Sequence, residues 1–97
     1  MRISASDQVQ LWLQGLPPET KRRVRRELKT LADGRPRLLD LKPLRHELEG
    51  FYRLRVGDHR IVYHIEPGPV VRLDYADLRD VVYDVFRHVR ALRETRE

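Results

Sequence analysis

Two arginines in the middle of the chain, Arg55 and Arg60, are spaced so that they could bind an anion together. The segment 52–63, Tyr-Arg-Leu-Arg-Val-Gly-Asp-His-Arg-Ile-Val-Tyr, has alternating β-branched, aromatic and charged residues on both sides of the turn dipeptide Gly57-Asp58. This pattern predicts a β-hairpin in which Arg55 faces Arg60 and Leu54 faces Ile61. Like charges directly opposite each other destabilise a hairpin by a few tenths to about 1 kcal/mol. We therefore expect an anion between the two guanidinium groups, and phosphate is the leading candidate.

The overall composition agrees with an anionic partner. The formal net charge is +5 over 97 residues, which is typical of proteins that bind a polyanion or an acidic protein segment, and the charge alone does not choose between them. The chain contains no cysteine, which excludes disulfides and thiol nucleophiles and fits a reducing compartment. No run has the roughly 20 apolar residues of a membrane span or the apolar stretch of a secretory signal. We expect a cytoplasmic protein with no membrane contact, and one domain spanning residues 1–97.

Three helices and a small sheet should position the arginines. Ser4 or Ser6 can cap a first helix, because apolar residues then recur at helical spacing: Val9, Trp12, Leu13 and Leu16. Pro18 suits the first turn of a second helix that ends near Asp33, antiparallel to the first. A third helix is expected from Asp77 onwards, with apolar residues at 78, 82, 85, 89 and 92.

The strands are predicted from alternation and turn residues. A short strand can occupy Arg2 to Ser4, residues 35–50 are expected to be a loop, and three strands follow as an antiparallel meander: Phe51 to Val56, His59 to Ile65 and Val70 to Tyr75. Alternation predicts one face that packs on the helices, formed by Tyr52, Leu54, Val56, Ile61, Tyr63, Ile65, Val71, Leu73 and Tyr75. It predicts a cationic opposite face, with Arg53, Arg55, Arg60, Val62, His64, Arg72 and Asp74. The fold class is α+β: an N-terminal helical hairpin on an antiparallel sheet of three to four strands, with a C-terminal helix.

This order of elements resembles a known family. The segment Leu41-Lys42-Pro43-Leu44, the block from Gly50 to Tyr63, and Arg79 four residues before Tyr83 are similar to the RelE/ParE toxins of type II toxin-antitoxin systems, and more to the RelE-like mRNA interferases. The resemblance covers most of the chain. It implies a RelE-like fold, a cognate antitoxin as partner, and ribosome-dependent cleavage of messenger RNA without a cofactor or metal ion. In that reaction a 2′-hydroxyl attacks the neighbouring phosphate and leaves a cyclic phosphate and a 5′-hydroxyl.

The resemblance also implies which residues take part. The basic pair of the first hairpin strand corresponds to Arg53 and Arg55, the arginine of the next strand to Arg60, and the C-terminal pair to Arg79 and Tyr83. RelE carries lysines where this chain has Arg53 and Arg55, and a guanidinium group cannot give up its proton. The reaction needs a base, an acid, and cations that stabilise the phosphorane. We expect Arg55, Arg60, Arg79 and Tyr83 to be catalytic, with the arginines as cations and Tyr83 as acid or base.

Further basic residues would contact the RNA: Arg53, Lys42, Arg45 and His64. His64 is predicted on the face of Arg55 and Arg60, and it is an alternative base because its ordinary pKa is close to neutral pH. The arginines could instead form a solvated face that pairs with Asp74 or Glu47. Tyr83 could simply pack beside Phe86. His46 and His88 have no spacing that suggests a metal site.

Two other functions remain open at this stage. A ParE-like toxin would inhibit DNA gyrase by protein binding, on the same fold and without nuclease chemistry. A small RNA-binding module would bind RNA without cutting it. The second predicted helix carries six basic residues, Lys21, Arg22, Arg23, Arg25, Arg26 and Lys29, which form either a solvated face or an auxiliary contact with nucleic-acid backbone.

Overall fold

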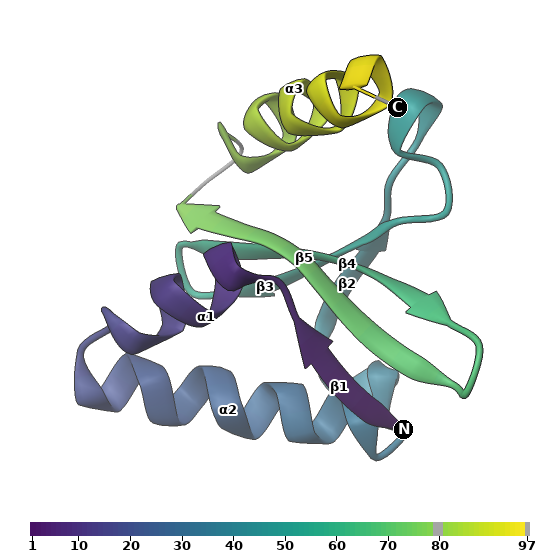
Figure 1. The fold of residues 1–97 in the computed structure, drawn as a ribbon. Helices are drawn as coiled ribbons and strands as arrows, with labels where there is room; N and C mark the ends of the chain where they lie inside the picture. The colour runs from purple at the N-terminus through teal and green to yellow at the C-terminus, as the bar shows by residue number, and fades with distance from the viewer. Residues whose placement is uncertain (79–80, 97) are drawn as a thin grey trace.

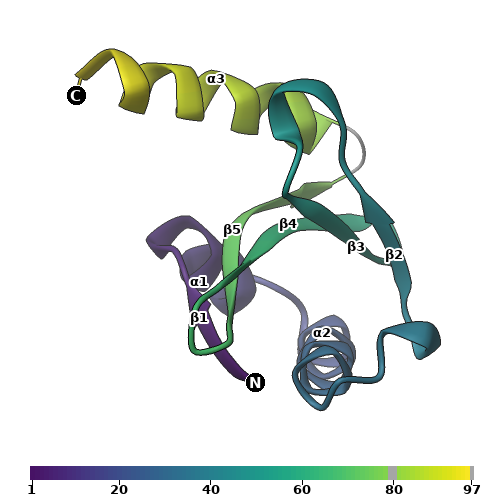
Figure 2. The same cartoon turned by 90° about the vertical axis from the view of Figure 1, so that its right-hand side faces the viewer.

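The computed structural model describes residues 1–78 and 81–96 of the chain. Within these residues a five-stranded sheet has the order β1-β5-β4-β3-β2. The strands are β1 (Arg2–Ala5), β2 (Asp40–Pro43), β3 (Tyr52–Val56), β4 (His59–Glu66) and β5 (Val70–Leu78), and the helices are α1 (Asp7–Gln14), α2 (Pro18–Ala32), η1 (Pro36–Leu38), η2 (His46–Leu48) and α3 (Val81–Arg96). Helices α1 and α2 cover one face of the sheet, and α3 lies over the other (Figure 1, Figure 2). The predicted α+β class is confirmed.

The two N-terminal helices form as the sequence predicts. The hydroxyl of Ser6 accepts a hydrogen bond from the backbone N–H of Val9, at 3.3 Å, and so caps α1. Pro18 occupies the first turn of α2, where its missing N–H has no cost. The chain reverses direction between the two helices (Figure 1). The apolar sides of α1 and α2 face the sheet and pack against one of its two faces.

The hairpin of β3 and β4 has the predicted register. Arg55 lies opposite Arg60, and Leu54 lies opposite Ile61. Gly57 in the turn has φ +61, a left-handed conformation that favours glycine. The facing arginines inferred from the sequence are therefore a feature of the structure.

The prediction of a loop over residues 35–50 was wrong, because this segment contains β2. Strand β2 pairs antiparallel with β3, with Leu41 opposite Leu54, and β1 adds a parallel strand on β5 at the other edge. The sheet thus has five strands, more than the three to four expected. Pro43 is tolerated at the end of β2 because this strand is at the edge of the sheet, where a missing N–H breaks no ladder.

A bulge in β5 changes which side chains share a face. In the ladder of β4 and β5, Val62 lies opposite Tyr75 and the next pair is Tyr63 with Leu73, so Asp74 is the extra residue. Tyr75 therefore lies on the face of α3, where its ring stacks near Phe86 at 6.4 Å between centroids. The predicted place of Tyr75 on the face of α1 and α2 was wrong, because simple alternation cannot include a bulge.

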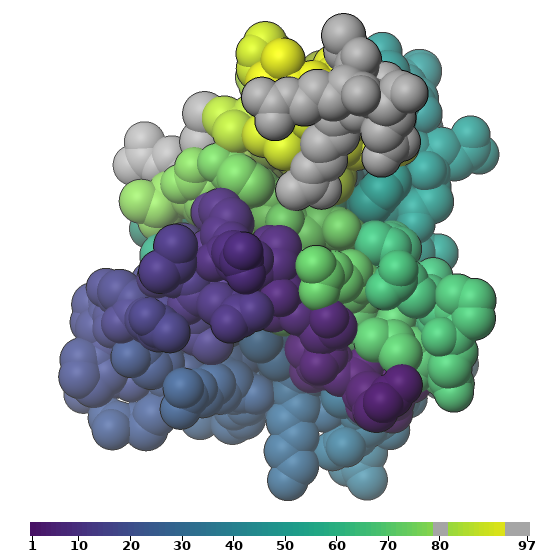
Figure 3. Space-filling model, viewed as in Figure 1, coloured from purple at the N-terminus to yellow at the C-terminus, as the bar shows by residue number. Residues whose placement is uncertain are grey.

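The sheet has an apolar core on each face. The larger core lies under α1 and α2 and includes Val9, Val24, Leu28, Leu31, Leu54, Val56, Ile61, Tyr63, Val71, Leu73 and Ala76. The smaller core lies under α3, and its buried members among the residues whose burial the structure describes are Leu48, Val62, Val82 and Phe86. In the space-filling view the N-terminal helices and α3 lie at opposite ends of the molecule, with β5 between them (Figure 3). The expectation that all helices share one face was wrong, since α3 covers part of the cationic face.

The third helix begins later than predicted. Asp77 and Leu78 belong to β5, and α3 starts at Val81. Because β5 continues past Tyr75, the side chain of Leu78 is half exposed at the end of the sheet and does not take part in a helix. No helix in the described part of the chain is long and apolar enough to cross a membrane.

Candidate functional site

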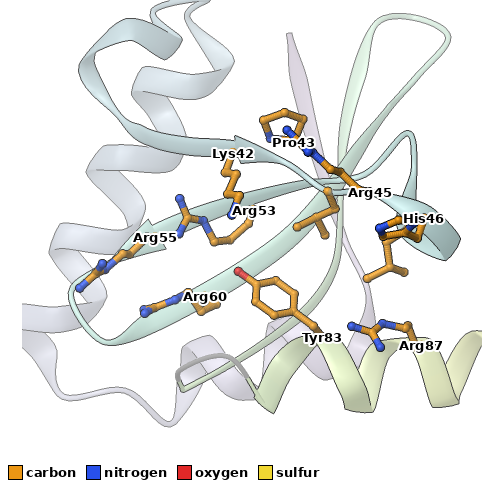
Figure 4. A pocket seen from close by; sticks show the side chains of 11 residues that line it. Lys42, Pro43, Arg45, His46, Arg53, Arg55, Arg60, Tyr83 and Arg87 are labelled. Carbon is orange, nitrogen blue, oxygen red and sulfur yellow. The ribbon is translucent and has the colours of Figure 1, made fainter.

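An open pocket of about 670 Å³ lies on the cationic face, between the hairpin, β2, η2 and α3. It is lined by Lys42, Pro43, Leu44, Arg45, His46, Leu48, Arg53, Arg55, Arg60, Tyr83 and Arg87. Figure 4 shows these side chains around the space between the strands and α3. Six of them are lysine or arginine, and none of the described lining residues is acidic. A pocket of this charge attracts anions.

Arg60 is the buried member of the arginine pair. Its side chain is only 8% exposed, and its Nη1 donates hydrogen bonds to the backbone carbonyls of Gly57 and His59, at 3.3 Å each. These contacts hold the guanidinium group close to the turn. A cation that is fixed before a ligand arrives does not need to be ordered during binding.

Arg55 is exposed and is held by the same turn. Its Nε donates to the carbonyl of Gly57, at 3.2 Å, so Arg55 and Arg60 both bind one backbone oxygen. The shared carbonyl explains how two like charges on neighbouring strands are kept together. Among the described residues, no carboxylate forms an ion pair with Arg55.

Arg53 differs because it has an acidic partner. Its Nη2 lies 2.8 Å from Oδ1 of Asp40, and the Arg53 side chain is only 14% exposed. Its Nε is buried and has no hydrogen-bond partner among the described residues. Because Arg53 already has an acidic partner in Asp40, Arg55 is the more available cation on β3.

Tyr83 enters the pocket from α3. Its half-buried ring packs against the smaller core, and its hydroxyl points toward the side of the pocket with Arg53 and Arg60 (Figure 4). Tyr83 thus packs against the core, as a structural tyrosine would, and it also lines the pocket. Arg79, the other predicted C-terminal residue, lies outside the described residues.

His64 does not line this pocket. Its Nδ1 lies 2.6 Å from Oδ2 of Asp74, its Nε2 lies 3.6 Å from Glu66, and its ring packs edge-on against Phe51. Burial raises the pKa of the Asp74 carboxyl, and the hydrogen bond and charge of His64 oppose that rise. His64 is therefore engaged on the same sheet face but away from the pocket. Lys42 and Arg45, which were also predicted to contact RNA, do line it.

Among the lining residues that the sequence did not predict, two have side chains that can bind an anion, His46 and Arg87. Arg87 follows Tyr83 by four residues, so a helix places both on one face, and this spacing was the signal for it. His46 lies in the segment expected to be a loop, and nothing in its spacing marks it. Within the described residues, no group of three or more His, Cys, Asp or Glu side chains could hold a metal ion.

Comparison with known proteins places this fold among bacterial and archaeal toxins. No model of a known protein family matches the sequence, and no curated protein matches it either. Solved structures do match. The chain is similar to one from the RelBE2 toxin-antitoxin complex of Mycobacterium tuberculosis, with 26% identity, a TM-score of 0.66, and coverage of 80% of this chain and 96% of that one.

Two further structures support the same class. A chain of the RelB-RelE antitoxin-toxin complex of Methanococcus jannaschii is 19% identical with a TM-score of 0.66, and the match covers 89% of this chain and 99% of that one. A chain of the Escherichia coli DinJ-YafQ complex is 16% identical with a TM-score of 0.59, covering 80% and 93%. The class defined by this fold is that of small toxins from toxin-antitoxin systems. Within that class the chain has the fold of the RelE-family toxins, and the predicted resemblance to that family is confirmed.

Proposed function

We propose that this chain is the toxin of a type II toxin-antitoxin system and acts in the cytoplasm as a ribosome-dependent messenger-RNA endonuclease, with residues 1–97 forming one toxin domain. One observation carries the proposal. Arg55 and Arg60 from the sheet and Tyr83 from α3 line one basic pocket. These are three of the four residues that we expect to be catalytic from the resemblance to RelE-like toxins.

The proposed reaction divides its roles among these side chains. The 2′-oxygen of a ribose attacks the adjacent phosphorus, the bond from phosphorus to the 5′-oxygen breaks, and a cyclic phosphate and a 5′-hydroxyl result. Arg55 and Arg60 stabilise the extra negative charge of the phosphorane, and each such donor contributes on the order of 10² to 10³ in rate. Their shared hydrogen-bond acceptor, the carbonyl of Gly57, positions them in advance.

Proton transfer falls to a group other than arginine, because a guanidinium group stays protonated in proteins. Tyr83 is in the pocket and can donate a proton to the leaving 5′-oxygen, or accept the proton of the 2′-hydroxyl. A phenol has an ordinary pKa of about 10 and is a weak base at neutral pH. Nearby guanidinium charges stabilise a phenolate, which makes the second role accessible.

The partner of the toxin is proposed to be an acidic, partly apolar antitoxin segment. Related folds have been solved in complexes with the antitoxins RelB and DinJ. On this chain, acidic side chains would cover the pocket, or apolar ones would replace α3 on the smaller core. In both cases the ribonucleotide backbone could not reach Arg55 and Arg60.

Primer extension on messenger RNA after induced expression tests the proposal. We expect discrete, in-frame cuts on translated messages from the wild type, and none from Arg60→Glu. Because Arg60 is buried, Arg55→Glu provides a second, exposed variant, and circular dichroism checks that both are folded. Arg2→Glu, on the strand at the far edge of the sheet, is the matched control and should cut normally.

Other outcomes separate the competing functions. Gyrase-dependent DNA breaks with intact messenger RNA would favour a ParE-like inhibitor and contradict the proposal. Tight RNA binding with no cyclic-phosphate product would indicate an RNA-binding module. Full translation arrest by a folded Arg60→Glu variant would remove Arg60 from the mechanism.

A further inference from the structure

The pocket extends beyond Arg55 and Arg60 to a second group of basic side chains. Arg45 and His46 come from the segment of η2, and Arg87 comes from α3. Figure 4 shows Tyr83 between this group and the sheet arginines. The two groups thus lie at opposite ends of one continuous pocket.

His46 has an unusual backbone conformation. Its φ is +57°, and it is the one non-glycine residue with a positive φ in the described part of the chain. This left-handed conformation is unfavourable for a residue with a Cβ atom, and such strain is often found where a side chain has a function. Here the conformation accompanies a ring that lines the pocket.

Arg87 is available for an anion. It lies one helical turn after Tyr83, and its only described ion pair joins Nη1 to Oδ1 of Asp84 at 3.5 Å. Both side chains of that pair are exposed, Arg87 by 48% and Asp84 by 78%. Exposed pairs of this type contribute little to stability, so a phosphate can take the place of Asp84. Guanidinium groups bind phosphate through charge-assisted hydrogen bonds.

We propose that Arg45, His46 and Arg87 form a second phosphate subsite, which binds the phosphate next to the scissile one along the RNA strand. The pocket volume of about 670 Å³ is within the range of roughly 300 to 1,000 Å³ found for sites that hold a whole small molecule. A single phosphate between Arg55 and Arg60 would leave the end with Arg87 empty. The assignment of the ligand as RNA depends on the proposed function, whereas the binding of a second phosphate can be tested without cleavage.

Three short probes isolate the second phosphate. The first is ApA with 2′-O-methyl riboses, which cannot be cleaved, and the other two are the same dinucleotide with an added 5′-phosphate or 3′-phosphate. Affinities are measured by NMR titration of the purified protein. We expect one of the two extended probes to bind the wild type about threefold to tenfold more tightly than ApA, as one added hydrogen bond of ordinary net strength would give.

Substitutions then show which residues cause the tighter binding of the extended probe. Arg87→Gln and His46→Asn should abolish the preference for the extended probe while affinity for ApA stays the same; asparagine tolerates the left-handed conformation, so the second variant keeps the turn. Arg55→Gln should weaken binding of all three probes and keep the preference. Arg2→Gln should change nothing.

Two results would overturn the subsite. The first is that neither extended probe binds the wild type more tightly than ApA. The second is that the preference for the extended probe persists in both Arg87→Gln and His46→Asn. A different result would refute the proposed function and leave the subsite standing. In that case the preference for the extended probe remains and depends on Arg87, but induced expression leaves messenger RNA intact.

Discussion

Replacement of Arg55 by glutamine should weaken anion binding between the facing arginines while it leaves the fold almost equally stable. Arg55 is exposed and lies opposite Arg60 across the hairpin. Loss of its charge relieves a repulsion of about 0.2 to 1 kcal/mol. Loss of its hydrogen bond to the carbonyl of Gly57 costs about 0.5 to 1.5 kcal/mol. The two terms oppose each other, so the free energy of unfolding should change by no more than about 1.3 kcal/mol.

Phosphate should stabilise the wild type more than this variant. At a phosphate concentration ten times the dissociation constant, binding to the folded state adds RT ln 11, about 1.4 kcal/mol. For a domain of this size that corresponds to a rise in Tm of about 6 to 11 °C. The assay is thermal unfolding followed by circular dichroism, in phosphate and in chloride at equal ionic strength.

A control is needed because phosphate also stabilises proteins by exclusion from their surface. Arg2→Gln removes one arginine from β1, outside the pocket, and should show the full rise. Arg55→Gln should show a smaller rise, because the contribution of the facing arginines is lost. If Arg55→Gln keeps the full phosphate-dependent rise, or if the wild type gains nothing over chloride, the inference that the facing arginines hold an anion is refuted.

Three further outcomes are expected. Tyr83→Phe should lower the rate of messenger-RNA cleavage on purified ribosomes by about 10²- to 10⁴-fold, because it removes a proton-transfer group; an unchanged rate would assign Tyr83 a packing role only. Phe86→Ala should lower the free energy of unfolding by about 3 to 5 kcal/mol in urea titrations, since this ring is buried under α3. Burial, with the charge of Tyr52 adding, raises the pKa of Tyr63 to about 12. The unfolded chain therefore loses this proton first, and stability should fall by about 2 to 3 kcal/mol between about pH 10 and pH 12, a fall that Tyr63→Phe should not show.

The parts of the site that follow from local sequence were predictable. The hairpin register depends on alternation and on one turn dipeptide, so the sequence alone places Arg55 opposite Arg60. The two N-terminal helices likewise follow from a cap, two prolines and apolar spacing. Each of these signals lies within a few residues of the feature that it determines.

The remaining parts depend on contacts between distant segments. Strand β2 has four residues and ends in Pro43, so only its pairing with β3 makes it a strand. The bulge at Asp74 moves the side chain of Tyr75 to the opposite face of the sheet, and no nearby residue in the sequence indicates this bulge. The side on which α3 packs was not predictable either, because its apolar stripe fits both sheet faces. His46 and Arg87 were missed because the pocket is completed only where η2 and α3 approach the sheet.

The two halves of the pocket are supported by apolar cores of unequal size, and this difference affects how a partner could block the pocket. Arg55 and Arg60 stand on strands whose other face belongs to the larger core, which α1 and α2 close. Tyr83 and Arg87 belong to α3, which packs on the smaller core, and four buried residues of that core lie in the described part of the chain. Because burial free energy grows with apolar area, displacement of α3 costs less than opening the larger core. An antitoxin segment that competes for the smaller core would therefore remove Tyr83 and Arg87 together, while the sheet arginines remain in place for its acidic side chains.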